Sequence, residues 1–433
     1  MANVIFTNKC NIQCPFCFAT ENNAKDCENT EQFTIADTWE LTNFLTINTP
    51  FKFCGGEPSI NPEIDKAIDL ILKSKRNVTL LTNGLWPNSF QEYIMNIPPR
   101  DQYRITYLFN VLEPSFYTSA QIKKLHHTLN TINPAVASLG FTIYKKDFEY
   151  EYLFELSKAF NIKRIRWSIT APNIQGPDYL LENDFEFIAS RFYEFYMKAI
   201  ENGITVVGDC GYLPPCFFTS ENFKKISLLS ENSRNFVRFK CNNSPVDIDN
   251  KGIAWRCYGL YSVLKQPIKN FASEDELRAY FNRRIRLLDN IFPYQRCKTC
   301  EYWLKGCSGG CYAIRIKKAL SIDPDLCIFP IDDDNAILDC KPQRIENLIL
   351  RNYKMKKFIA FNTKIVEDPD ENMISFIEEV DGKKSISELI DMWKENFDSY
   401  DIAKATVIEM CRKVFEMDMI TINYDYRIEL EGN

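Results

Sequence analysis

The chain has 433 residues, 45% of them hydrophobic and 25% charged, a composition that is ordinary for a globular protein. Its formal net charge of −6 argues against broad nucleic-acid binding, which requires a basic surface. No apolar run approaches the roughly 18 residues of a membrane-spanning helix, and the first residues lack the basic and apolar regions of a secretory signal.

Cysteine is the abundant metal-ligand side chain of this sequence. Sixteen cysteines occur against only two histidines, His126 and His127. The missing signal predicts a reducing cytoplasm, where disulfides are rare and clustered cysteines more often bind metal. Because thiolate is the only soft ligand in quantity, the sequence favours iron–sulfur sites over mixed Cys/His zinc sites.

The first predicted strand, residues 3–7, leads into Cys10, Cys14 and Cys17, which are spaced by three and then two residues. Three thiolates in this spacing can each hold one iron of a [4Fe–4S] cluster, so the fourth iron has no protein ligand. Zinc sites prefer paired cysteines that a fourth Cys or His completes. The pattern therefore indicates an iron–sulfur site with an open iron, with a zinc knuckle as the alternative.

Strands and helices then alternate as far as residue 201. Further strands are predicted at 51–54, 78–82, 104–111, 137–144 and 162–169, and helices at 34–46, after Asn61, 119–131, 150–160 and 183–201. This alternation predicts parallel βαβ units. Six units suit an α/β fold with an open, partial (β/α)6 barrel, in which functional groups gather at the C-terminal ends of the strands.

Three polar stretches follow the ends of predicted strands. They are Gly55-Gly56-Glu57-Pro58, Thr82-Asn83-Gly84 and Asn110. Glycines let backbone approach a ligand closely, and a glutamate offers a charged acceptor to an ammonium group. A tight turn with a solvated glutamate is the alternative for the first stretch, and an ordinary Asn-Gly turn for the second.

The cysteine spacing, with Phe16 just before the third cysteine, and the Gly-Gly-Glu-Pro stretch resemble the signature of the radical S-adenosylmethionine (SAM) superfamily. The resemblance implies that the open iron chelates the amino and carboxyl groups of SAM. Cleavage of SAM then gives a 5′-deoxyadenosyl radical that abstracts a hydrogen atom. It also implies a set of SAM-binding residues: Phe16, Gly55, Gly56, Glu57, Thr82, Asn83 and, toward the ribose, Asn110.

A second cysteine-rich region follows residue 205. Cys241 is followed by ten residues, Gly252, four residues and Cys257; Cys297-x2-Cys300-x6-Cys307-x3-Cys311 comes next, with Cys327 beyond. This region resembles the SPASM domain, which binds two auxiliary [4Fe–4S] clusters. The usual pattern has five residues where this chain has six, between Cys300 and Cys307.

The resemblance implies the auxiliary ligands, which makes three [4Fe–4S] clusters in all. One set is Cys241, Cys257 and Cys311 with Cys216 as the fourth ligand, for which Cys210 competes; the other is Cys297, Cys300, Cys307 and Cys327. Eight thiolates would ligate both clusters fully, which favours electron relay. A pair of zinc ribbons is the alternative.

The last stretch predicts a small winged-helix-like domain. A basic linker helix is expected at 345–356, strands at 357–361 and 419–424, and helices at 368–380, 386–396 and 401–416. The stretch resembles the precursor-peptide recognition element, the fold of the pyrroloquinoline quinone peptide chaperone. Such domains bind a leader peptide as an added strand on a sheet edge. A structural cap or a dimerisation unit is the alternative.

The sequence thus predicts three domains, 1–204, 205–344 and 345–433, and a cytoplasmic radical SAM maturase of a ribosomally made precursor peptide. Expected partners are that peptide with its leader segment and a reductant such as ferredoxin or flavodoxin, with no nucleic acid or membrane. An anaerobic sulfatase-maturing enzyme, which makes formylglycine, is the nearest alternative. A non-catalytic iron–sulfur or zinc protein is the alternative from another class.

Overall fold

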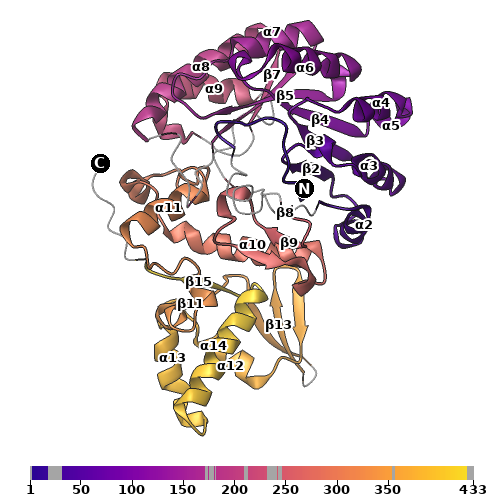
Figure 1. Cartoon of the computed structure of the whole chain (residues 1–433). Coiled ribbons are helices and arrows are strands. Elements are labelled where there is room, and N and C mark those ends of the chain that lie inside the picture. Colours follow the sequence, from indigo (N-terminus) through magenta and orange to yellow (C-terminus); the bar gives the residue numbers. More distant parts are fainter. Residues whose placement is uncertain are drawn as a thin grey trace. The chain divides into compact units, whose positions relative to one another are not determined.

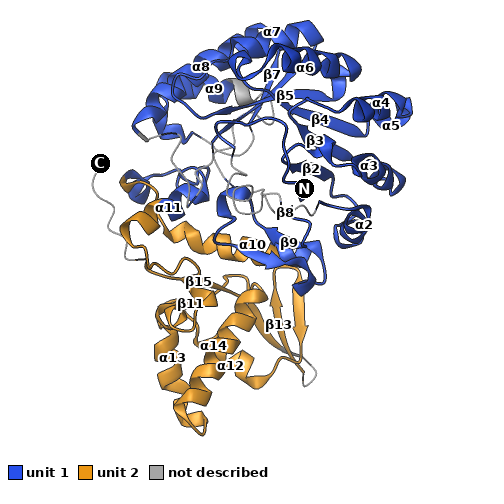
Figure 2. Ribbon diagram, in the orientation of Figure 1, with its two compact units in different colours: residues 1–278, 296–317 blue, residues 279–295, 318–433 orange. Residues whose placement is uncertain are grey.

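The structure is a computed structural model that describes residues 2–17, 32–170, 174, 180, 182–208, 213–231, 241, 246–353 and 356–426. These residues form two compact units (Figure 2). Unit 1 comprises Met1–Arg278 and Arg296–Lys317, and unit 2 comprises Ala279–Gln295 and Lys318–Asn433. The predicted boundary at 204 falls inside unit 1, and the predicted boundary at 344 falls inside unit 2.

Unit 1 is built on one sheet with the strand order β10-β9-β8-β1-β2-β3-β4-β5-β6-β7. Neighbouring strands from β8 through β7 pair in parallel, whereas β9 and β10 are antiparallel. The six predicted strands are confirmed as β1 Ala2–Thr7, β2 Phe51–Gly55, β3 Val78–Thr82, β4 Ile105–Asn110, β5 Ala137–Ile143 and β6 Arg164–Ile169. A further parallel strand that the sequence did not predict, β7 Thr205–Gly208, extends the sheet.

Helices cover the outer side of this sheet (Figure 1). They are α2 Ile35–Phe44, α3 Ile64–Lys73, α4 Asn88–Asn96, α5 Pro99–Gln102, α6 Ser119–Thr131, α7 Glu151–Phe160, α8 Phe185–Glu201 and α9 Ser220–Glu231. Apolar residues of both layers are buried between them, so the mixed α/β architecture with a parallel core is confirmed.

Two helix starts show how the sequence directs the fold. Thr34 and Asp37 form the predicted capping box at the start of α2. Asn61 does not cap α3, which begins at Ile64. Its side-chain amide instead donates to Phe6 O and Phe33 O, both at 2.9 Å. Its Oδ1 accepts from Glu63 N at 2.9 Å and closes a turn before the helix, so α3 begins later than predicted.

The remaining elements of the cysteine-rich region are short. They are β8 Val246–Ile248, β9 Ile253–Trp255, β10 Lys265–Pro267, α10 Glu274–Leu287 and α11 Tyr312–Ile322. β8 pairs in parallel with β1, from Ala2 opposite Val246 to Val4 opposite Ile248. The region after residue 245 therefore adds directly to the strand that leads into the first cysteine.

Unit 2 combines two small sheets with three helices. β11 Lys341–Arg344 pairs with β15 Ile420–Asn423, and an antiparallel sheet contains β12 Ile349–Tyr353, β13 Lys356–Phe361 and β14 Lys364–Glu367. The helices are α12 Glu371–Glu379, α13 Ile386–Trp393 and α14 Tyr400–Glu416. The three predicted helices and the two predicted strands are confirmed.

The predicted linker helix at 345–356 was wrong. Residues 349–353 form β12, which pairs with β13 from Ile349 opposite Ala360 to Tyr353 opposite Lys356. Branched and aromatic side chains at both ends of this segment favour a strand once a partner is available. In the part of the chain that the structure describes, no helix has the length and apolar character needed to cross a bilayer.

Candidate functional site

The first cysteine loop follows the C-terminal end of β1. The Cys17 N–H donates to Cys14 O at 3.2 Å, which folds the last three residues into a turn. Burial and the charges of Glu57 and Cys17 raise the pKa of Cys10, and burial together with the charges of Cys17 and Cys10 raises that of Cys14 to about 12. The three thiols are thus gathered closely enough to repel one another as thiolates, and a bound cationic centre would relieve that repulsion.

The Gly-Gly-Glu-Pro loop passes directly across the chain that enters this cysteine loop. The Gly56 N–H donates to Thr7 O at 2.7 Å, and the Glu57 N–H donates to Lys9 O at 2.8 Å. A Cβ on Gly56 would lie 2.0 Å from Lys9 O, and Gly55 has a φ of 120°. Glycine is therefore required here so that two backbone segments can touch.

The Glu57 carboxylate is fully buried and accepts three hydrogen bonds. Its Oε1 accepts from Ser59 N at 3.1 Å and from Thr82 Oγ1 at 2.8 Å, and its Oε2 accepts from Asn83 N at 2.7 Å. Burial raises the pKa of this carboxyl group, and the hydrogen bonds oppose that rise. The side chain ties the β2 loop to the end of β3.

Asn83 connects this network to the first cysteine. Its side-chain Nδ2 donates to Asn11 Oδ1 at 2.8 Å and lies 3.7 Å from Cys10 Sγ, to which it also donates. Asn11 Nδ2 in turn donates to Leu85 O at 2.8 Å. The structure therefore brings together three motifs predicted separately, the cysteines, the Gly-Gly-Glu-Pro loop and Thr82-Asn83-Gly84.

Asn110 lies at the C-terminal end of β4 with its side chain exposed. It stands opposite Gly140 of β5, where a Cβ would come within 2.8 Å of Asn110 Oδ1. The absence of a side chain at Gly140 leaves room for the amide. Asn110 is thus placed at the predicted edge of the sheet.

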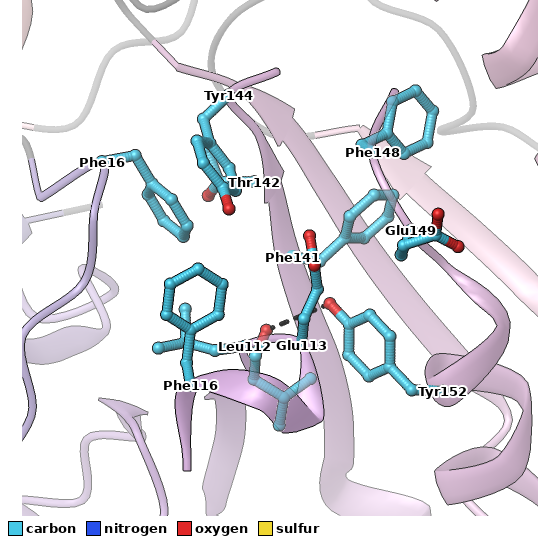
Figure 3. A pocket seen from close by; sticks show the side chains of 11 residues that line it. Phe16, Leu112, Glu113, Phe116, Phe141, Thr142, Tyr144, Phe148, Glu149 and Tyr152 are labelled. Carbon is cyan, nitrogen blue, oxygen red and sulfur yellow. Dashed lines mark hydrogen bonds between the residues drawn. The ribbon is translucent and has the colours of Figure 1, made fainter. Parts of the chain in front are cut away.

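A small pocket opens beside the cysteine loop, past the ends of β4 and β5 (Figure 3). Phe16, Phe116 and Tyr144 line one side of it, and the rings of Phe16 and Tyr144 have centroids 4.8 Å apart. The other lining residues are Val111, Leu112, Glu113, Phe141, Thr142, Phe148, Glu149 and Tyr152. The pocket has mostly aromatic walls.

The two carboxylates of this pocket have cationic partners. Glu113 pairs with Lys145 at 2.9 Å, and Glu149 lies 3.7 Å from Arg191. Sequence reasoning found Phe16 but missed Tyr144 and Glu113. Their signal was available, since Tyr144 ends the predicted strand 137–144 and Glu113 follows the predicted strand 104–111, but a lone aromatic or acidic residue at such a place is common.

The second cysteine-rich region forms a first cluster of thiols around Arg256. We call Cys241, Cys257 and Cys311 the Cys241 group. Each of its thiols interacts electrostatically with the others; burial raises the pKa of Cys257, and it raises that of Cys311 to about 11. Arg256 Nη1 donates to Cys241 Sγ at 3.8 Å. The structure thus brings together three of the four thiols predicted for one auxiliary cluster.

Cys297, Cys300 and Cys307, which we call the Cys297 group, lie on one folded loop of unit 1. The Cys300 N–H donates to Cys297 O at 3.3 Å, and Gly309 N–H donates to Cys307 Sγ at 3.2 Å. The six-residue spacer closes as a turn in which Leu304, with a φ of 57°, donates from its N–H to Cys307 O at 3.0 Å. The extra residue is absorbed in that turn.

Two predicted ligands of the auxiliary clusters have neighbours that differ from those in their predicted ligand sets. The thiol of Cys216 interacts electrostatically with Cys307 and Cys300. Cys327 belongs to unit 2, where burial, the charge of Asp339 and the charge of Cys327 together raise the pKa of Cys340 to about 12. Cys210, the competitor for Cys216, lies outside the described residues.

Every described cysteine is a free thiol. Among the described residues, no three His, Cys, Asp or Glu side chains are placed to hold a single metal ion.

Comparison with known proteins identifies part of the chain. Residues 4–100 match the family model of the radical SAM superfamily, whereas no curated protein matches the chain in sequence. Streptococcus suis SuiB bound to S-adenosylmethionine has a similar fold, with a TM-score of 0.50, 16% identity and 74% of each chain covered.

Two further structures have the same degree of similarity. SuiB bound to its precursor peptide SuiA has a TM-score of 0.50 and 15% identity, over 74% of this chain and 73% of SuiB. Native anSMEcpe with bound AdoMet and Cp18Cys peptide has a TM-score of 0.50 and 13% identity, over 72% of this chain and 88% of anSMEcpe. The predicted resemblance is therefore confirmed: residues 4–100 match the radical SAM superfamily, and the chain shares the fold of SuiB and anSMEcpe.

Proposed function

We propose that this chain cleaves S-adenosylmethionine and uses the resulting radical to abstract a hydrogen atom from a ribosomally made precursor peptide. The observation that carries the proposal is the meeting of three motifs at the C-terminal edge of the sheet. Cys10, Asn83 and Glu57 are joined there by hydrogen bonds. This is the edge at which barrels of this type carry their chemistry.

Cys10, Cys14 and Cys17 would hold a [4Fe–4S] cluster, because their free thiols are gathered on one loop. When bound, the cluster supplies the electron and the open iron for reductive cleavage of SAM. The chain's own contribution is positioning. Asn83 Nδ2 donates to Cys10 Sγ and would stabilise the thiolate.

We place the adenine of SAM in the aromatic pocket. Phe16 lies in the cysteine loop itself, and Tyr144 and Phe116 offer ring faces beside it. A flat heterocycle packs well against such rings. Asn110 would meet the ribose at the end of β4, and Gly55 with Gly56 would hold the methionine moiety.

Glu57 fits a positioning role for the methionine moiety. Its carboxylate is fully buried and already accepts hydrogen bonds from Ser59, Thr82 and Asn83. In this role it would fix the loop whose backbone faces SAM and would not itself receive the ammonium group. This refines the role that the resemblance implied.

The two thiol groups of unit 1 would hold auxiliary [4Fe–4S] clusters, and these would carry away the second electron. A small reductant such as ferredoxin or flavodoxin would supply the first electron. We place the chain in a reducing cytoplasm, where thiols remain available to bind clusters.

A peptide substrate is supported by the two structural neighbours that were solved with peptides bound. Unit 2 adds a surface for a leader segment. β14 pairs only with β13 among the described strands, so it is an edge, and its Ile365 is 66% exposed. An extended leader would add to this edge through main-chain hydrogen bonds, with Ile365 as an apolar contact.

The opposite edge provides a matched control for this proposal. Ile349 is 46% exposed and belongs to β12, the strand at the opposite edge of the same sheet. We expect Ile365→Asp to weaken binding of a leader-bearing peptide encoded beside the gene and Ile349→Asp to leave it unchanged. Fluorescence anisotropy with the labelled peptide measures both. Equal effects of the two substitutions, or none, would contradict leader binding at β14.

The reaction itself is tested with the same peptide, reconstituted protein, SAM and dithionite. Mass spectrometry should find the peptide altered and an equal amount of 5′-deoxyadenosine. A peptide that stays unaltered while 5′-deoxyadenosine accumulates would contradict the choice of substrate but not the cleavage of SAM.

A further inference from the structure

We propose that Cys216, and not Cys327, is the fourth ligand of the Cys297 group. The proposal rests on the proposed function, since it assigns a ligand of one of its auxiliary [4Fe–4S] clusters. It departs from the ligand set that the resemblance implies, in which Cys216 serves the Cys241 group. The reasons are the placement of the short helical turn that carries Cys216 and the chemistry around its thiol.

Cys216 sits on a 3-10 turn, Pro215–Phe217, that is fixed on both sides. The Phe217 ring packs edge-on against Phe185 of α8, with centroids 5.0 Å apart. On its other side, the Arg296 guanidinium lies 4.4 Å from the centre of the same ring. Arg296 directly precedes Cys297, so this cation–π contact joins the turn to the start of the loop that carries the Cys297 group.

The thiol of Cys216 faces that loop. Its electrostatic neighbours are Arg296, Cys307 and Cys300, and no member of the Cys241 group is among them. Cys216 is exposed, so the thiol is accessible to an assembling cluster.

The distribution of cysteines between the two units agrees with this assignment. Cys216 and the three members of the Cys297 group all belong to unit 1. Cys327 belongs to unit 2, where its described thiol neighbour is the buried Cys340. With Cys216, the Cys297 group has four thiolates within unit 1, the number that a fully ligated cluster takes.

Alkylation of the full chain tests the assignment without any measure of turnover. The reconstituted protein and the iron-free protein are treated with iodoacetamide under anaerobic conditions, and mass spectrometry follows the labelling of Cys216. We expect the cluster to protect Cys216. The protection should be lost in Cys297→Ala/Cys300→Ala and retained in Cys257→Ala/Cys311→Ala.

The reverse pattern would overturn the proposal and return Cys216 to the Cys241 group. Labelling of Cys216 at the iron-free rate in the reconstituted wild type would also overturn it. Because Cys216 is unaltered in all of these variants, the measurement does not depend on a substitution at the tested position.

Iron content gives a second, independent test. In the Cys257→Ala/Cys311→Ala background, Cys216→Ala should remove up to about four further irons, whereas Cys327→Ala should remove none. In the Cys297→Ala/Cys300→Ala background, Cys216→Ala should remove no more iron. Loss of iron with Cys327→Ala in the first background would contradict the assignment.

These outcomes are separable from failure of the proposed function. All the variants keep Cys10, Cys14 and Cys17, so cleavage of SAM can be measured in parallel. If the wild-type protein forms no 5′-deoxyadenosine but Cys216 is protected from alkylation in the expected pattern, the proposed enzymatic function is contradicted and the assignment of Cys216 as a ligand is supported.

Discussion

Glu57→Gln separates a positioning role of Glu57 from direct contact with SAM. The glutamine oxygen can replace Oε1 and keep the hydrogen bonds from Ser59 N and Thr82 Oγ1. Its NH2 group would then occupy the place of Oε2, where the Asn83 N–H now donates at 2.7 Å. Two donors would face each other in a buried site.

The expected loss of stability follows from the single hydrogen bond between the Asn83 N–H and Glu57 Oε2. A hydrogen bond to a buried charged acceptor contributes about 1.5–3 kcal/mol, and an unsatisfied buried donor costs about 1–3 kcal/mol. Neutralising the side chain offsets part of this free-energy loss, because burial disfavours the charged carboxylate and raises its pKa. We therefore expect a net loss of about 2 kcal/mol, or about 3 °C in Tm for a unit of this size.

Differential scanning fluorimetry and SAM titration are the assays, with the exposed Glu92→Gln as the matched control. We expect Glu57→Gln to lower both Tm and SAM affinity, because Asn83 shifts with the lost bond, and Glu92→Gln to change Tm by less than about 1 °C. A variant with unchanged Tm that no longer binds SAM would refute the positioning role. It would show that the carboxylate itself meets the ligand.

Three further substitutions test other parts of the account. Gly56→Ala should destabilise unit 1 by more than about 2 kcal/mol in urea, because its Cβ would meet Lys9 O at 2.0 Å. Tyr144→Ala should weaken SAM binding about 3- to 10-fold in calorimetry, since it removes a ring whose centroid lies 4.8 Å from that of Phe16. Burial raises the pKa of Asp247 from 3.8 to about 7. The stability that this group contributes is complete below about pH 4 and is lost by pH 7, so Asp247→Asn should gain up to about 4 kcal/mol over wild type at pH 8.

The three substitutions Gly56→Ala, Tyr144→Ala and Asp247→Asn each have a matched control in the same chain. A Cβ added at Gly306 would meet nothing within 4 Å, so Gly306→Ala should be nearly neutral. Tyr103 is 65% exposed, and Tyr103→Ala should leave SAM binding unchanged. For Asp247→Asn, the difference from wild type should shrink as the urea series is repeated toward pH 4. A difference that stays constant with pH would contradict burial as the cause of the raised pKa.

Local pattern was enough to predict much of unit 1. Each strand from β1 to β6 is a short apolar run followed by a polar or glycine loop, and parallel pairing then brings those loops to one edge. The capping boxes at Thr34 and Ser385, where two of the predicted helices begin, each involve residues only three apart in sequence. These features depend on neighbours in sequence.

The features that the sequence could not predict depend on partners far along the chain. β12 forms because Ile349 to Tyr353 pair with β13. Glu57 is buried because residues 82 and 83 cover it with donors. The neighbours of Cys216 come from a loop more than eighty residues later, and no spacing rule within the cysteine pattern contains that information.

The measurement that tests the central claim most directly is the formation of 5′-deoxyadenosine. The full chain is reconstituted with iron and sulfide, reduced with dithionite in the absence of oxygen and given SAM, and the product is quantified by mass spectrometry. The account predicts product from the wild type and from Cys411→Ala, whose cysteine is buried in unit 2, and none from Cys14→Ala. Absence of product from a wild type with full iron content would contradict it.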